Sequence, residues 1–164
     1  MKAKLTLTLI LCVFMLACTR NAFVQAARGT LLSVNESVTV MDEVVADHYA
    51  DAPLDDLTVD EALDKWTCAF LTIDATVLTS WAILRRIEAG PPKLDDGDAM
   101  MFLKSMAELA PPVMYLLYLG EAYGMDTTPI DPALDAIRKY LGTGEPIEVP
   151  EDLNCSDVLG GSNE

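Results

Sequence analysis

Histidine is nearly absent from this sequence, and so are the short motifs that bring catalytic or ligand-binding residues together. The 164 residues include one histidine, His48. A catalytic nucleophile needs an oriented base, and zinc sites usually need several histidine or cysteine ligands. The chain has no Glu-x-x-His pair, no phosphate loop, no dinucleotide-binding glycine fingerprint and no metalloprotease helix. We therefore predict no catalytic, cofactor-binding or metal-binding residue, and a protein that is not an enzyme.

Basic residues are also scarce. Lysine and arginine together number 11, against 26 aspartates and glutamates, for a net charge of −15. This balance argues against a nucleic-acid partner, because cationic contacts to phosphate dominate such binding. It argues equally against electrostatic docking on an anionic membrane. A cationic partner stays open, and the alternative is an acidic surface that only confers solubility.

The apolar run at the N-terminus, Leu5 to Leu16, is about 12 residues long and too short to span a bilayer comfortably. It follows the basic stretch Met1-Lys2-Ala3-Lys4, as in a secretory signal peptide. Cleavage before Cys18 is one possibility. The other is cleavage after Val24-Gln25-Ala26, which has suitable small residues but lies far from the run and inside a helical pattern. Both place the mature protein outside the cytoplasm.

The residues Met15-Leu16-Ala17-Cys18 resemble the lipobox of bacterial lipoproteins, in which cysteine follows a small residue and an aliphatic residue stands three positions before it. In that family the cysteine is diacylated on sulfur and becomes the new N-terminus. The match departs from the usual pattern at Leu16, where a smaller residue is usual, and at Met15, where leucine is usual. The resemblance implies a signal peptide at 1–17 and lipidation of Cys18. The protein would then be a membrane-anchored lipoprotein facing the periplasm or cell exterior, with simple secretion of a soluble protein as the alternative.

Four cysteines are present, and two of them are expected to remain available for pairing. Cys12 would leave with the signal peptide and Cys18 would carry lipid, which leaves Cys68 and Cys155 in an oxidising compartment. We predict a disulfide between them, with two free thiols as the alternative. Closing a loop of about 86 residues would stabilise the fold by up to roughly 4–5 kcal/mol in the chain-entropy model.

The longest helical pattern runs from Thr58 to Glu88. Thr58 and Glu61 fit a capping box, and Gly90-Pro91-Pro92 stops the pattern. Apolar residues recur at steps of three or four and form one stripe: Val59, Leu63, Trp66, Phe70, Ile73, Val77, Trp81, Leu84 and Ile87. We expect this helix to be contacted from two sides, because Leu71, Leu78 and Ala82 lie off the main stripe.

Two further long segments and one short one repeat the helical pattern. They are Asn21 to Tyr49, Asp95 to Tyr123, and Asp131 to Leu141, the last ended by Gly142. Pro111-Pro112 predicts a kink or break in the second of these. Short loops favour antiparallel neighbours. We predict an all-α, up-down bundle of three long helices plus a short fourth helix in residues 18–142, followed by an acidic, mostly irregular tail at 143–164.

Taken together, the lipobox, the short mature chain and the amphipathic helices resemble the small helical lipoproteins of phages, prophages and other bacterial mobile elements. The resemblance implies an accessory role at the cell envelope through contact with another envelope protein. We predict a non-enzymatic structural or protein-interaction module. One alternative is a secreted carrier of a small apolar ligand, held in the bundle core near Pro111-Pro112, Tyr115 and Tyr118. A second is a metal-binding bundle that uses His48 and nearby carboxylates such as Asp47 and Asp51.

Overall fold

The computed structural model describes residues 19–52, 57–91, 93–141 and residue 153. These ranges form α-helices and one 3-10 turn, and no strand occurs within them. The elements are α2 (Thr19–Tyr49), α3 (Leu57–Ala89), α4 (Asp96–Ala122), η1 (Thr128–Ile130) and α5 (Asp131–Leu141). The predicted all-helical architecture, with four α-helices, is confirmed for this part of the chain. The predicted signal segment, and the predicted tail apart from Leu153, lie outside the described residues.

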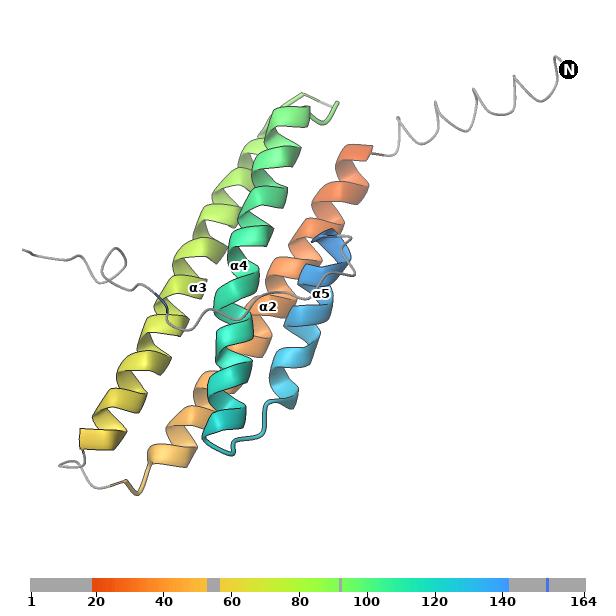
Figure 1. Cartoon of the computed structure of the whole chain (residues 1–164). Helices are drawn as coiled ribbons and strands as arrows, with labels where there is room; N and C mark the ends of the chain where they lie inside the picture. The colour runs from red at the N-terminus through yellow and green to blue at the C-terminus, as the bar shows by residue number, and fades with distance from the viewer. Residues whose placement is uncertain (1–18, 53–56, 92, 142–152, 154–164) are drawn as a thin grey trace, which may run out of the picture.

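The helices alternate in direction and pack around a square (Figure 1). α3 packs against α2 and α4, and α5 packs against the same two helices. The backbones of α3 and α5 make no close approach, and neither do those of α2 and α4, so each of these pairs is diagonal. With 11 residues against 31, 33 and 27 in the long helices, α5 fills only part of the fourth corner.

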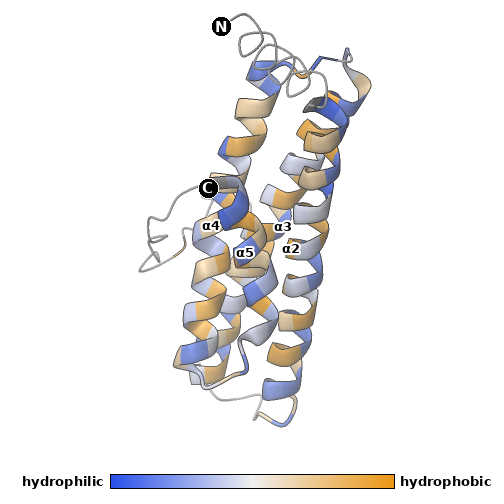
Figure 2. Ribbon diagram, turned by 90° about the vertical axis from the view of Figure 1, so that its right-hand side faces the viewer, coloured by the Kyte–Doolittle hydropathy of each residue, from blue (hydrophilic) through white to orange (hydrophobic). Residues whose placement is uncertain are grey.

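Apolar and polar residues alternate around each helix, which directs one face of each into a common core (Figure 2). The predicted stripe of α3 supplies fully buried Trp66, Ile73 and Leu84. The expectation that this helix is contacted from two sides is confirmed, since α3 packs against α2 and α4. Leu71, Leu78 and Ala82, which lie off the main stripe, are nevertheless exposed, Leu78 to 61%. α3 has only two helical neighbours, because α5 lies diagonally opposite. The stretch Thr58–Ala89 is long and apolar enough to cross a membrane. The core helix of a soluble protein often meets the same criterion of length and composition.

The helix ends follow local capping chemistry. Asp95 is the N-cap of α4, and its carboxylate accepts hydrogen bonds from the amides of Gly97 at 2.8 Å and Asp98 at 3.2 Å. α3 begins at Leu57, so Thr58 stands inside the first turn and not at the predicted cap position. The last residue of α3 is Ala89, directly before Gly90-Pro91-Pro92, which was predicted to end the helix.

The predicted break at Pro111-Pro112 does not occur, because α4 is continuous from Asp96 to Ala122. Each proline removes an amide donor and crowds the preceding turn. The surrounding apolar residues offset this cost: Leu109, Ala110 and Val113 are buried on the same helix.

Two glycines shape the turn that follows α4. Gly124 has a positive φ of 69°, and Met125 donates its amide to the carbonyl of Gly120 at 2.8 Å. This geometry closes the helix end and reverses the chain. A Cβ at Gly120 would lie 2.3 Å from the Thr127 methyl carbon, so only glycine lets the chain fold back this closely. The turn therefore brings η1 and α5 against α2.

Candidate functional site

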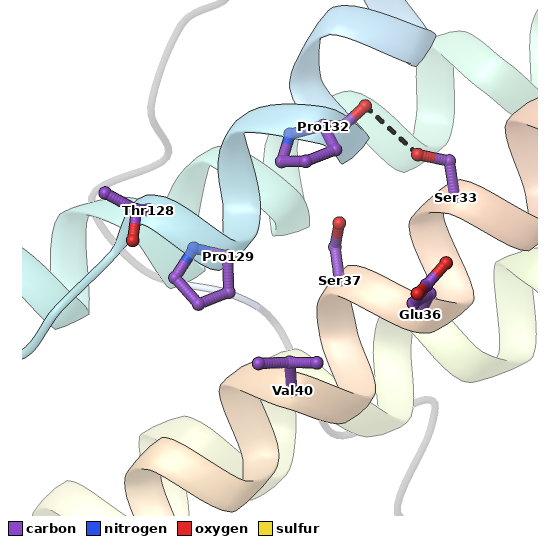
Figure 3. Close-up of a pocket in the computed structure, with 7 residues that line it drawn as sticks. All are labelled: Ser33, Glu36, Ser37, Val40, Thr128, Pro129 and Pro132. Carbon is purple, nitrogen blue, oxygen red and sulfur yellow. Dashed lines mark hydrogen bonds between the residues drawn. The ribbon is translucent and has the colours of Figure 1, made fainter.

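The described residues form an open pocket of about 380 Å³ between α2 and the η1–α5 segment (Figure 3). We call it the α2–η1 pocket. Its lining residues come from two parts of the chain: Ser33, Glu36, Ser37, Val40, Thr128, Pro129 and Pro132. The four residues from α2 follow helical spacing, so they share one face of that helix.

Local hydrogen bonds hold the wall opposite α2. Asp126 accepts from the Thr128 hydroxyl at 2.7 Å and from the Thr128 amide at 3.0 Å. These two hydrogen bonds hold the pKa of the Asp126 carboxyl below its ordinary value, and the Thr128 hydroxyl contributes more than the Thr128 amide. Ser33 donates its hydroxyl across the pocket to the carbonyl of Pro132 at 3.3 Å. These contacts fix η1 and the start of α5 relative to α2.

Ser37 differs from most hydroxyl residues on the long helices. Its side chain is only 5% exposed, and its hydroxyl points from α2 toward Pro129 and Pro132 (Figure 3). Other helix hydroxyls donate back to the carbonyl four residues earlier, as seen for Thr39, Thr72, Thr76, Thr79 and Ser80. Among the described residues Ser37 makes no such bond and has no other hydrogen-bond partner. A hydroxyl without a hydrogen-bond partner is thus directed into the pocket.

Glu36 is the one charged side chain of the lining, and it is exposed at the rim. Val40, Pro129 and Pro132 supply apolar surface. The lining thus offers hydroxyl and carboxylate oxygens beside apolar surface. It suits a group that combines hydrogen-bond donors with an apolar stem.

The cysteines predicted to be modified are placed only in part. Cys18 and Cys155 lie outside the described residues. Cys68 is buried in α3, and its Sγ lies 3.7 Å from the carbonyl oxygen of Leu153. Leu153 is half-buried against the core. The position two residues before Cys155 is therefore next to Cys68, and the disulfide stays a prediction.

His48 is exposed at the end of α2, and its ring lies edge-on to Tyr49 with 4.9 Å between centroids. Asp47 and Asp51 beside it are also exposed. Within the described ranges, no group of three or more histidine, cysteine, aspartate or glutamate residues is arranged to hold a metal ion. The metal-binding alternative gains no support from this arrangement.

The residues predicted for an apolar-ligand cavity are mostly packed core. Pro112 and Tyr115 are buried, and the ring of Tyr115 stacks on that of Tyr118 at 6.3 Å. Tyr118 itself is 53% exposed. The α2–η1 pocket lies elsewhere on the bundle and uses none of these residues. Sequence reasoning missed it, because Ser33 and Ser37 look like any hydroxyls on a helix.

Comparison of the chain with protein-family models, with curated proteins and with solved structures gives no match.

Proposed function

We propose that this chain is a non-enzymatic lipoprotein of the bacterial cell envelope, of the phage or prophage accessory kind. In this proposal Cys18 carries the lipid anchor, and the helical bundle is a structural or protein-interaction module for another envelope protein. A secreted, unanchored protein is the alternative.

The packing of residues 19–26 carries the proposal. The guanidinium of Arg20 donates to the backbone carbonyls of Glu88 and Pro91 at the far end of α3. The ring of Phe23 lies 5.5 Å from that of Phe102 and 6.3 Å from that of Tyr140. Cleavage before Cys18 preserves these contacts, whereas cleavage after Ala26 would remove them. The integrated first turns of α2 thus support processing at the lipobox over simple secretion.

The surface supports a role in protein contact. Several large apolar side chains are exposed on an otherwise acidic molecule: Leu32, Val40, Leu71, Leu78, Met100, Met101 and Tyr118. These side chains are available to a protein partner on α2, α3 and α4. The α2–η1 pocket adds a concave site to this surface.

Metabolic labelling with a palmitate analogue in a bacterial host tests the anchor. We expect label on the wild-type chain and none on Cys18→Ala. The matched control is Cys68→Ala, which removes a cysteine from α3 and should keep the label. Equal labelling of the wild type and Cys18→Ala, or no labelling of either, contradicts lipidation at Cys18.

A further inference from the structure

We propose that the α2–η1 pocket binds a single basic side chain, a lysine or an arginine, presented by a partner protein. The inference rests on the proposed function as an interaction module and names the chemistry of the partner. Three properties of the pocket support it: a hydroxyl without a hydrogen-bond partner, a carboxylate and apolar walls.

The first property is the Ser37 hydroxyl. Ser37 as a residue is 5% exposed, and its hydroxyl points toward Pro129 and Pro132. The hydroxyl oxygen opens into the pocket and has no hydrogen-bond partner among the described residues. A ligand that donates a hydrogen bond into the pocket would satisfy this hydroxyl, whereas a purely apolar ligand would exclude solvent and leave it unsatisfied, at a cost of about 1–3 kcal/mol.

The second property is charge. Glu36 lies one residue from Ser37 and brings a carboxylate to the rim. The chain from Cys18 onward has nine basic and 26 acidic residues, a net charge of −17. This field attracts cationic partners and repels anionic ones. An ammonium or guanidinium is therefore the donor that the site favours.

The third property is shape. The pocket volume of about 380 Å³ is near the lower end of ligand sites and exceeds the needs of one extended side chain. Val40, Pro129 and Pro132 offer apolar walls to the methylene stem of lysine or arginine, which packs along apolar surface while its charged end stays hydrated. The Ser37 hydroxyl, the Glu36 carboxylate and the apolar walls of the pocket would then contact different parts of one lysine or arginine side chain.

Two peptides test the proposal on the full chain in a neutral detergent, without lipidation. One is an acetylated, amidated peptide with a single lysine between glycines, and the other carries norleucine in its place. We expect the lysine peptide to shift the amide NMR signals of Ser33, Glu36, Ser37, Val40 and Thr128 saturably, and the norleucine peptide to leave them unchanged. Signals that fail to move with the lysine peptide, or that move equally with both, overturn the proposal.

Variants separate the pocket from general attraction by an acidic surface. Glu36→Gln should weaken binding of the lysine peptide about tenfold at low salt, equivalent to about 1.4 kcal/mol, and Ser37→Ala should weaken it several-fold. The control Asp74→Asn removes the same charge from an exposed position on α3 and should leave binding unchanged. Equal weakening by Glu36→Gln and Asp74→Asn overturns the proposal. So does binding of n-butylammonium without binding of the peptide, because the mouth would then exclude a protein. These results are independent of Cys18 labelling.

Discussion

Gly120 has no side chain, and this permits the chain to return from α4 toward α2. A Cβ there would lie 2.3 Å from the Thr127 methyl carbon and 3.3 Å from the Met41 methyl carbon. We predict that Gly120→Ala lowers the free energy of unfolding by about 1–3 kcal/mol, the usual cost of overpacking. Urea denaturation measures the change.

The control for this prediction is Gly29→Ala in α2. Nothing lies within 4 Å of a Cβ at Gly29, which is exposed within the helix. Alanine there should raise the free energy of unfolding by about 0.5–1 kcal/mol, because alanine costs less helix entropy. A Gly120→Ala variant that is stabilised to the same extent as Gly29→Ala would contradict the close packing of the turn.

The phenol of Tyr140 gives the fold a dependence on alkaline pH. Burial raises the pKa of Tyr140 from 10.0 to about 12, and the Thr30 hydroxyl offsets this only in part. The unfolded chain ionises at the lower pKa, so the contribution of Tyr140 to stability is fully present below about pH 10 and is lost as the pH rises toward about 12. In a titration of tyrosinate absorbance, Tyr140→Phe should remove a component that titrates near pH 12. Burial also raises the pKa of Tyr49, so the test is the loss of amplitude: a component near pH 12 that is undiminished in Tyr140→Phe would rule out the assignment.

Helix periodicity indicates which residues are buried, but it does not indicate which polar atoms are left without partners. The predicted stripe of α3 is correct at Trp66 and Leu84, because a residue every three or four positions must face the same core. The environment of Ser37 depends on Pro129 and Pro132, more than ninety positions later. No local pattern encodes that contact.

At the scale of the element, α4 shows that packing outweighs a local propensity. Two consecutive prolines remove two amide donors from the middle of a helix that stays continuous. We predict that Pro111→Ala, at a half-buried position, raises the free energy of unfolding by about 1–3 kcal/mol through the restored amide bond. Thermal unfolding followed by circular dichroism checks this. A lower melting temperature for Pro111→Ala would mean that the proline ring itself stabilises the bundle.

The order of helices around the bundle is the element-level property that the sequence leaves open. Four amphipathic segments with short connections predict antiparallel neighbours, and this holds for α2, α3 and α4. The diagonal placement of α5 relative to α3 follows from the turn at Gly120 and Gly124, which directs the chain toward α2. This placement leaves Leu71 and Leu78 exposed, although α3 is contacted from two sides as predicted. The 3-10 turn η1 is also missed, since three residues carry no periodic signal.

At the scale of the whole molecule, the contact with Cys68 places Leu153 against α3. We predict that unreduced protein contains the Cys68–Cys155 disulfide, and that alkylation before reduction modifies neither cysteine. Intact mass spectrometry with and without reductant checks this. The variant Cys155→Ser should lower the melting temperature, and the reductant should no longer affect it. Two alkylated thiols in unreduced protein would contradict the disulfide.

Charge is distributed unevenly along the bundle. The end opposite Thr19 gathers acidic side chains: Asp42, Glu43, Asp47, Asp51, Asp60, Glu61, Asp64, Glu121 and Asp126. Basic side chains lie mostly toward the other end, near the start of α2 and the end of α3: Arg20, Arg28, Arg85, Arg86 and Lys93. This end also carries Glu88, Asp95, Asp96 and Asp98, and the ion pairs Arg28–Glu88 and Arg86–Asp98 lie there, so it is close to neutral. Under the proposed anchor, an anionic membrane therefore repels mainly the opposite, acidic end. The bundle would therefore stand away from the bilayer.

The start of α2 at Thr19 then determines how far each residue of α2 lies from the membrane. With lipid on Cys18 no linker residue separates the anchor from the helix, and Arg20 binds the first turn to the carbonyls of Glu88 and Pro91. At 1.5 Å per residue, Glu36 lies about 27 Å along α2 from the anchored residue. An upright bundle would thus hold the α2–η1 pocket at a fixed distance from the membrane surface. A partner in the same membrane would need its basic residue at about that distance to be recognised.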